Sequence, residues 1–154
     1  MKHAHEKICR YLDEHSVDYQ VIKHEPVASV DEYHNVVGTR YEQQAKAIFI
    51  RVRRNGEKTF AVLAIQAQKR ADMQRLAELL GAREVRLATR EQLTEQTGCN
   101  YGELPPLGRL YGFQLLFDKD LLNEDEVYFN AGDLSTSISL DPKAILELER
   151  ATMY

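Results

Sequence analysis

The chain has 154 residues, enough for one substantial hydrophobic core, and its 44% hydrophobic and 29% charged residues are typical of a soluble globular protein. The formal net charge of −4 disfavours a protein that binds nucleic acid over its whole surface, although a local basic patch stays open. No run approaches the roughly 18 apolar residues of a membrane span, and the N-terminus lacks an apolar run of the signal-peptide type. Cys9 and Cys99 form neither a C-x-x-C motif nor a disulfide framework. We therefore expect a single cytoplasmic domain over residues 1–154, without a membrane segment.

Apolar periodicity, helix caps and turn residues divide the first half of the chain into helices and strands. Asn55-Gly56 is the strongest local signal, because this dipeptide typically joins two β-rich runs in a tight hairpin. Ser29 and Glu32 have the spacing of a capping box at the start of a helix. The predicted elements are a helix over 5–15, a strand over 19–23, a helix over 30–38, and hairpin strands over 45–53 and 58–65.

The second half is predicted in the same way. Asp72 and Gly81 are suited to begin and end a helix, Thr89 with Gln92 caps the next one, and Asp141 precedes a proline at the start of the last. The predicted elements are helices over 73–80, 89–97 and from 142 onward, with strands over 84–88, 113–118, 126–130 and 137–140. This order predicts a mixed α/β (α+β) domain with a curved mixed β-sheet flanked by helices, and not a regular βαβ series.

Residues 97–108 gather three of the eight glycines and two of the four prolines in the chain. Helix and strand are both disfavoured here, so the segment is predicted to be a shaped loop, stiffened by Pro105-Pro106 and hinged at Gly102 and Gly108. Such a loop can bring bare backbone N–H groups close to a ligand. A long connection with no binding role is the alternative, and composition alone does not decide between the two.

Lys46 is unusual because it lies within an otherwise apolar strand, between Ala45 and Ala47. A lysine there is costly unless its ammonium group reaches solvent, a partner or an anion. Strand alternation places it on the face of Ile48 and Ile50. The residue is either a lysine at the start of a strand that extends to water, or a cation at a sheet edge that holds a phosphate or carboxylate.

A third segment, residues 129–137, contains a Gly132-Asp133 pair followed by Ser135 and Thr136. These side chains are suited to line a polar pocket, but Asp and Ser also make good turns, and taken alone the turn is favoured. The chain contains no nucleotide-binding, metalloprotease or serine-hydrolase motif. His3 and His5 share a terminus, and His24 and His34 lack ligand spacing, so we predict neither a metal site nor a cofactor.

Taken in order, several of these pieces resemble the YbaK/ProX family of aminoacyl-tRNA editing domains. The likeness extends from about His24 to the C-terminal helix, and the order and spacing of the pieces make it specific. The segments that carry it are His24-Glu25-Pro26-Val27, Ala45-Lys46-Ala47-Ile48, residues 76–81, residues 97–108, and Phe129-Asn130-Ala131-Gly132.

The resemblance implies a fold, an activity and a set of site residues. Family members are single α/β domains on a mixed sheet, also found inserted in or fused to prolyl-tRNA synthetases, and they hydrolyse the ester that joins a wrong amino acid to its tRNA. Lys46 matches the family's signature lysine near the tRNA 3′ end. Gly102 to Pro106 match its G-x-x-x-P loop, where backbone groups contact the aminoacyl moiety and the attacking water. Ala131-Gly132 match the other pocket wall, followed by Asp133 where several members have His.

The implied chemistry is physically coherent for this chain. An aminoacyl ester is already activated, so the protein needs to position a water and stabilise the oxyanion and the terminal phosphate, with Lys46 as the electrostatic clamp and Gly102 as part of the oxyanion wall. Asp133, Ser135 and Thr136 favour a polar pocket for a hydroxylated residue within the Ala, Ser and Thr class. A local basic rim is expected from Arg51, Arg53, Arg54, Lys58, Lys69 and Arg70. The alternative is a non-catalytic module that binds tRNA or an aminoacyl nucleotide in association with a synthetase.

Overall fold

A computed structural model describes residues 4–154, so His3 lies outside the described residues. The main helices are α1 (Ala4–Glu14), α2 (Val30–Val37), α3 (Met73–Leu80), α4 (Arg90–Thr97) and α5 (Pro142–Glu149). The strands are β1 (Gln20–Lys23), β2 (Ala45–Arg54), β3 (Glu57–Gln66), β4 (Glu84–Leu87), β5 (Gln114–Phe117), β6 (Val127–Asp133), β7 (Thr136–Leu140) and β8 (Thr152–Met153). Three short 3-10 helices complete the described elements: η1 (Tyr41–Gln43), η2 (Arg109–Tyr111) and η3 (Lys119–Asn123).

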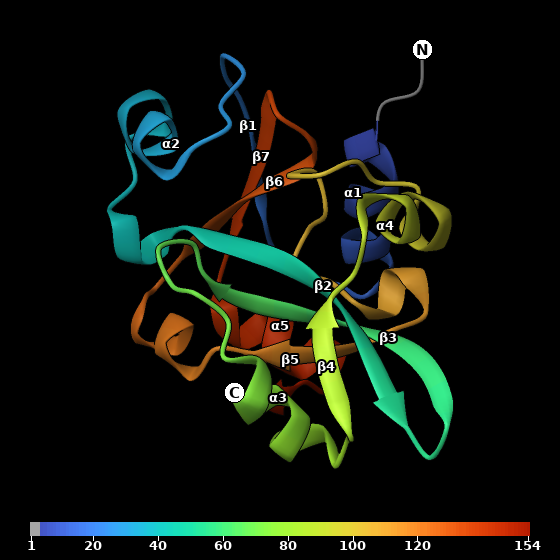
Figure 1. Ribbon diagram of the computed structural model, residues 1–154. Helices are drawn as coiled ribbons and strands as arrows, with labels where there is room; N and C mark the ends of the chain where they lie inside the picture. The colour runs from blue at the N-terminus through green and yellow to red at the C-terminus, as the bar shows by residue number, and fades with distance from the viewer. Residues whose placement is uncertain (1–3) are drawn as a thin grey trace.

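The mixed α+β class is confirmed, and the strands are divided between two sheets (Figure 1). One sheet is antiparallel, with the order β1-β7-β6. The other has the order β4-β2-β3-β5-β8 and is mixed, because β5 runs parallel to β3 and β8 runs parallel to β5. A single parallel bridge between Gln44 and Tyr128 connects the two sheets where β2 begins.

Alternation along β2 and β3 explains how the five-stranded sheet is buried on both faces. Ile50 and Val52 point to a core that α3 closes with Leu76 and Leu80. The opposite face, where Phe49 lies, packs with the three-stranded sheet and with α1, α4 and α5. The apolar run in β3 is therefore covered on both sides, and Figure 1 shows α3 and α1 on opposite sides of β2 and β3.

Local capping fixes where most helices begin and end. The side chains of Ser29, Asp72, Thr89 and Asp141 each accept a hydrogen bond from a backbone N–H in the first turn of the helix that follows. The hairpin between β2 and β3 turns at Asn55-Gly56, where both residues have positive φ, as a type I′ turn requires. These local features fix where the helices begin and where β2 turns into β3.

Candidate functional site

Lys46 lies on a short open edge of the five-stranded sheet. It pairs with Ile65 of β3 on one side, while β4 pairs with β2 only from Ile50 onward. At the other end, Gln44 is bridged to Tyr128 of β6. The strand edge around Lys46 is therefore unpaired between these two neighbours. A cation at such an edge is one of the two interpretations of Lys46 that the sequence left open.

The ammonium group of Lys46 has neither a hydrogen-bond nor an ion-pair partner among the residues that the structure describes. Lys69 differs, because its ammonium contacts Asp118 at 2.9 Å and Asp120 at 2.6 Å. Burial, and to a lesser degree the positive charge of Arg70, lower the pKa of Lys46 below its usual value. A half-buried cation with no partner is electrostatically suited to bind an anion.

Asn130 lies near the strand edge that carries Lys46. Gln44 and Tyr128 are bridged in parallel and β2 and β6 are in contact, and Lys46 and Asn130 each lie two residues further along their strand. Across β7, Asn130 pairs with Ser137. A polar strip thus crosses from β2 to β7 beside the open edge.

The loop of residues 98–108, called here the Gly/Pro loop, is bound to this strip. The Asn130 amide nitrogen donates to the Gly102 carbonyl at 3.3 Å, and the Gly132 N–H donates to the Glu103 carbonyl at 3.1 Å. Gly102 has φ +86°, a conformation that favours glycine, and its N–H has no acceptor among the described residues. The structure therefore brings the predicted loop and the predicted Ala131-Gly132 segment together.

Asn130 was not singled out as a site residue by the sequence, yet its amide oxygen Oδ1 is buried with no hydrogen-bond partner. Its orientation is determined, because the Gly102 carbonyl can only accept and must face the amide nitrogen. Leaving a buried acceptor unpaired is costly, which makes this atom a natural contact for a ligand donor. The signal available in the sequence was an Asn inside a strand, where this residue is depleted.

A second polar group lies beside this strip, where α2 covers the three-stranded sheet. The His24 Nε2 is 2.7 Å from the Ser137 hydroxyl, and the Tyr33 hydroxyl donates to the same oxygen at 2.6 Å. The Glu25 carbonyl, 2.8 Å from His24 Nδ1, can only accept, so Nδ1 donates to it. This has the contacts of a serine–histidine pair, but Ser137 is fully buried. Its hydroxyl is placed to hold α2 on the sheet and not to attack a substrate.

The other predicted pocket residues contribute through the backbone or through turn geometry. Pro105 and Pro106 are buried within the Gly/Pro loop, and Ala131 is buried in the core. The predicted Gly132-Asp133 turn is wrong, because both residues belong to β6, which carries a bulge there, and the turn lies at 134–135. The Asp133 carboxylate accepts from the Ser135 N–H at 2.9 Å and so stabilises that turn.

The predicted basic rim does not form as a unit. Arg51 is buried and pairs with Glu84 at 2.9 Å. Arg53, Arg54 and Lys58 lie at the far end of the hairpin, about 25 Å from Lys46 at the usual rise of a strand. Arg70 is the member that acts electrostatically on Lys46, whereas Lys69 is neutralised by two carboxylates.

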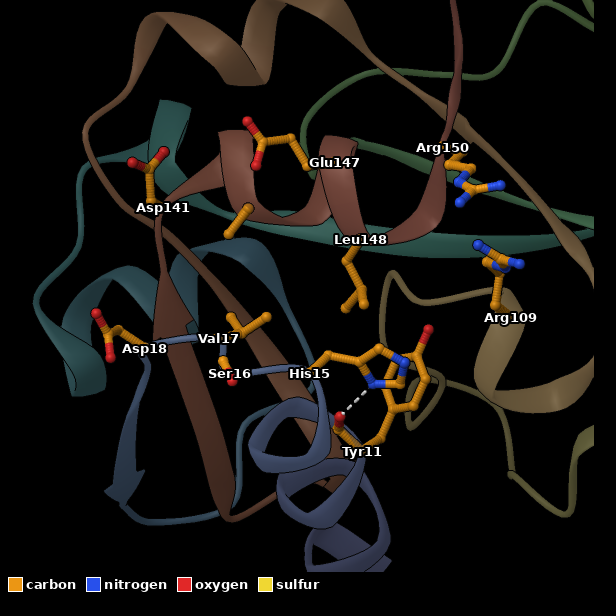
Figure 2. Close-up of a pocket in the computed structure, with 11 residues that line it drawn as sticks. Tyr11, His15, Ser16, Val17, Asp18, Arg109, Asp141, Glu147, Leu148 and Arg150 are labelled. Carbon is orange, nitrogen blue, oxygen red and sulfur yellow. Dashed lines mark hydrogen bonds between the residues drawn. The ribbon is translucent and has the colours of Figure 1, made fainter.

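A hollow of about 890 Å³ lies elsewhere, between the end of α1 and α5 (Figure 2). None of the site residues named above lines it. Beside it, the buried Glu149 carboxylate accepts from the Tyr11 hydroxyl at 2.9 Å and from the N–H groups of Gly108 and Arg109 at 2.9 and 2.8 Å. These contacts fix the C-terminal end of the Gly/Pro loop. Burial raises the pKa of Glu149 despite these bonds.

Comparison with known proteins identifies the family of this chain. Residues 24–148 match the model of the aminoacyl-tRNA editing domain. The chain belongs to the aminoacyl-tRNA editing domain family. The resemblance stated from the sequence is thereby confirmed.

Two curated relatives of this editing domain are similar over most of their length. The chain is 31% identical to the multifunctional Ser/Thr-tRNA deacylase ProXp-y of Escherichia coli (strain K12), covering 89% of this chain and 83% of the relative. It is 24% identical to the prolyl-tRNA editing protein ProX of Acetoanaerobium sticklandii, covering 96% and 92%.

The fold of the editing domain also has solved counterparts. One belongs to a protein provisionally described as a trans-editing enzyme for prolyl tRNA synthetase. It superimposes with a TM-score of 0.82 at 22% identity, over 100% of this chain and 96% of that one. At this identity the likeness shows the fold alone. Within residues 4–154, no helix is long and apolar enough to cross a membrane.

Proposed function

We propose that this protein is a trans-acting aminoacyl-tRNA deacylase, which hydrolyses the ester of a small mischarged amino acid of the Ser, Thr and Ala class. Membership of the editing family and the names of its relatives support the reaction class. The observation that carries the proposal is the unpaired Lys46 ammonium on the open edge, beside the Gly/Pro loop. The partner is the 3′ CCA end of an aminoacyl-tRNA, and association with a synthetase remains part of the proposal.

The reaction needs few protein groups. The oxygen of a water forms a bond to the ester carbonyl carbon, the bond from that carbon to the ribose oxygen breaks, and the ribose oxygen takes up a proton. The free N–H of Gly102 is positioned to donate to the developing oxyanion, and Lys46 binds the terminal phosphate. No protein nucleophile is required, which agrees with the burial of Ser137.

Asn130 supplies a contact for the substrate itself. The α-ammonium group of an aminoacyl ester, or the hydroxyl of a seryl or threonyl side chain, is a donor that the unpaired Asn130 Oδ1 can accept. The Asp133 carboxylate and the Ser135 N–H are occupied with each other in the turn. A preference for seryl and threonyl esters is therefore supported by the name of the Escherichia coli relative, and not by Asp133. Asn130 adds to that preference only where its Oδ1 accepts from the side-chain hydroxyl.

The test is release of amino acid from Ala-, Ser- and Thr-charged tRNAs by the wild type, by Lys46→Ala and by Lys58→Ala. Lys58 is an exposed lysine at the other end of the same hairpin and serves as the matched control. We expect release by the wild type and by Lys58→Ala, and a loss of about 100-fold or more in kcat/KM for Lys46→Ala.

Three outcomes would each overturn a part of the proposal. Binding of tRNA by the wild type without release from any of the three charged tRNAs would identify a binding module. Equal activity of wild type and Lys46→Ala would remove Lys46 from the site. Alanyl esters cleaved far faster than seryl esters would contradict the preference for a hydroxylated residue.

A further inference from the structure

Tyr101 stands next to Gly102 and is the most exposed of the large hydrophobic side chains in the described part of the chain. Its exposed fraction is 71%, compared with 60% for Leu87, the next in order. Its hydroxyl has no hydrogen-bond partner among the described residues. Neither core packing nor hydrogen bonding therefore accounts for an aromatic ring at the rim of the candidate site.

One face of this ring is occupied by Arg90, whose guanidinium carbon is 4.6 Å from the ring centroid. Two other tyrosines carry a cation in the same way, Tyr154 with Arg75 at 4.5 Å and Tyr111 with Lys7 at 4.8 Å. In those pairs the ring is built into the protein: Tyr154 is only 7% exposed, and the Tyr111 hydroxyl is 3.6 Å from the Cys99 sulfur. Tyr101 has a cation on one face and solvent around the rest of the ring.

The ring and its cation are held by a short, well-capped helix. Arg90 is the first residue of α4, whose N-terminus is closed by the reciprocal cap of Thr89 and Gln92. At the other end, Gly98 ends the helix, and the Thr94 hydroxyl donates to the Cys99 carbonyl at 3.1 Å. Tyr101 lies two residues after Cys99 and directly before Gly102, whose carbonyl accepts from the Asn130 amide. The ring is thus connected on both sides to fixed structure.

We propose that Tyr101 is a stacking platform for the base of the nucleotide that carries the amino acid. This inference rests on the proposed function. Aromatic rings stack on nucleobases with little dependence on sequence, and Arg adds a favourable cation–π contribution. In the terminal nucleotide the ribose carries the ester, with the phosphate on one side and the base on another. A site that holds the ester at Gly102 and the phosphate at Lys46 therefore places the base nearby, and Tyr101 is the residue adjoining Gly102.

The experiment uses the charged minihelix that the wild type cleaves best, prepared with either a normal or an abasic 3′-terminal nucleotide. Tyr101→Ala removes the ring, Tyr101→Phe keeps it, and Leu87→Ala removes another exposed apolar side chain as a control. With the base present, we expect Tyr101→Ala to lower kcat/KM by about 5- to 100-fold. Tyr101→Phe and Leu87→Ala should remain within about twofold of the wild type, since an aromatic ring is still present at position 101 in both variants.

The abasic substrate decides whether the ring acts on the base. On the abasic substrate, the kcat/KM of the wild type should fall by a similar factor relative to the normal substrate. The kcat/KM of Tyr101→Ala should be the same on both substrates. A loss for Tyr101→Ala that is equal on both substrates, or no loss on either, would overturn the inference. If the wild type releases no amino acid, the same combinations are compared by the dissociation constant of uncharged minihelix. The stacking contact is then tested separately from the proposed activity, because we expect the dissociation constants to differ by the same factors as kcat/KM.

Discussion

The two ends of the Gly/Pro loop are held in opposite ways. At Gly108 the backbone is buried, and the Glu149 carboxylate accepts from Gly108, Arg109 and Tyr11 with both of its oxygens. At Gly102 the backbone is exposed and is held through its carbonyl by Asn130. At this end the N–H of Gly102 and the Oδ1 of Asn130 have no hydrogen-bond partner among the described residues.

This difference separates a structural polar cluster from the proposed binding site. The closed end contains the more strongly buried charge and adjoins the 890 Å³ hollow, yet its donors and acceptors satisfy one another (Figure 2). The open end instead gathers an unpaired cation, an unpaired acceptor and an exposed ring among the described residues. We therefore locate the proposed site by its unsatisfied polar groups and not by cavity volume.

The largest effect on stability is expected from Glu149→Ala, at the closed end. The substitution leaves the N–H groups of Gly108 and Arg109 and the Tyr11 hydroxyl without their acceptor. We expect the free energy of unfolding to fall by about 3 kcal/mol, measured by urea denaturation, because buried donors are costly to leave unpaired.

Glu149→Gln is the matched variant, because its amide oxygen can still accept from both backbone groups. We expect it to lose about 1 kcal/mol at neutral pH. Since burial raises the folded-state pKa of Glu149, the folded protein binds a proton before the unfolded chain does. The wild type should therefore gain stability relative to Glu149→Gln as the pH falls through that folded-state pKa toward 4.5. Equal losses for the Ala and Gln variants would show that the closed end does not depend on these bonds.

A smaller contrast is expected between alanine substitutions of the two end glycines. A Cβ at Gly108 would lie 2.5 Å from the Phe113 carbonyl oxygen, a backbone atom that cannot move alone. A Cβ at Gly102 would have room, at 3.5 Å from Leu134, and only the positive φ opposes it. We expect losses in unfolding free energy of about 2–3 kcal/mol for Gly108→Ala and about 1 kcal/mol for Gly102→Ala. Equal losses would contradict the proposed difference between the ends.

Local features of the fold were predictable from the sequence because their causes lie within a few residues. The caps at Ser29, Asp72 and Thr89 and the Asn55-Gly56 hairpin all occur where their patterns indicated. The division into two sheets was not predictable in this way. It depends on the parallel pairing of β3 with β5 and on the single bridge from Gln44 to Tyr128, which join residues far apart in the chain.

The candidate site was predictable to a similar extent. Lys46 was identified because a lysine in an apolar strand is locally anomalous, and Gly102 because glycine and proline gather around it. Asn130 and Tyr101 were not predictable, because they are distinguished only by tertiary contacts: Asn130 contacts Gly102, and Tyr101 contacts Arg90. The predicted basic rim does not form as a unit, because the rise of the strand carries Arg53, Arg54 and Lys58 away from Lys46 and because carboxylates pair with Arg51 and Lys69.

The smallest stability effect and a large functional effect are expected together from Asn130→Ala. The substitution removes one hydrogen bond to the exposed Gly102 carbonyl, while the Gly132-to-Glu103 bond still holds the loop. It also removes a buried acceptor that is unpaired, so the loss of stability should be at most about 1 kcal/mol by urea denaturation. If Oδ1 accepts a donor of the substrate, kcat/KM for deacylation should nevertheless fall about 10-fold or more.

Asn130→Asp sharpens this test because it keeps an acceptor where Oδ1 lies but loses the donor to Gly102. Activity in Asn130→Asp that exceeds activity in Asn130→Ala would assign the functional loss to the acceptor. Equal activity in the two variants would instead assign it to the position of the loop. A loss of stability for Asn130→Ala as large as that for Glu149→Ala would mean that the two ends of the loop are held alike. The unpaired groups at the open end would then no longer distinguish it as the binding end.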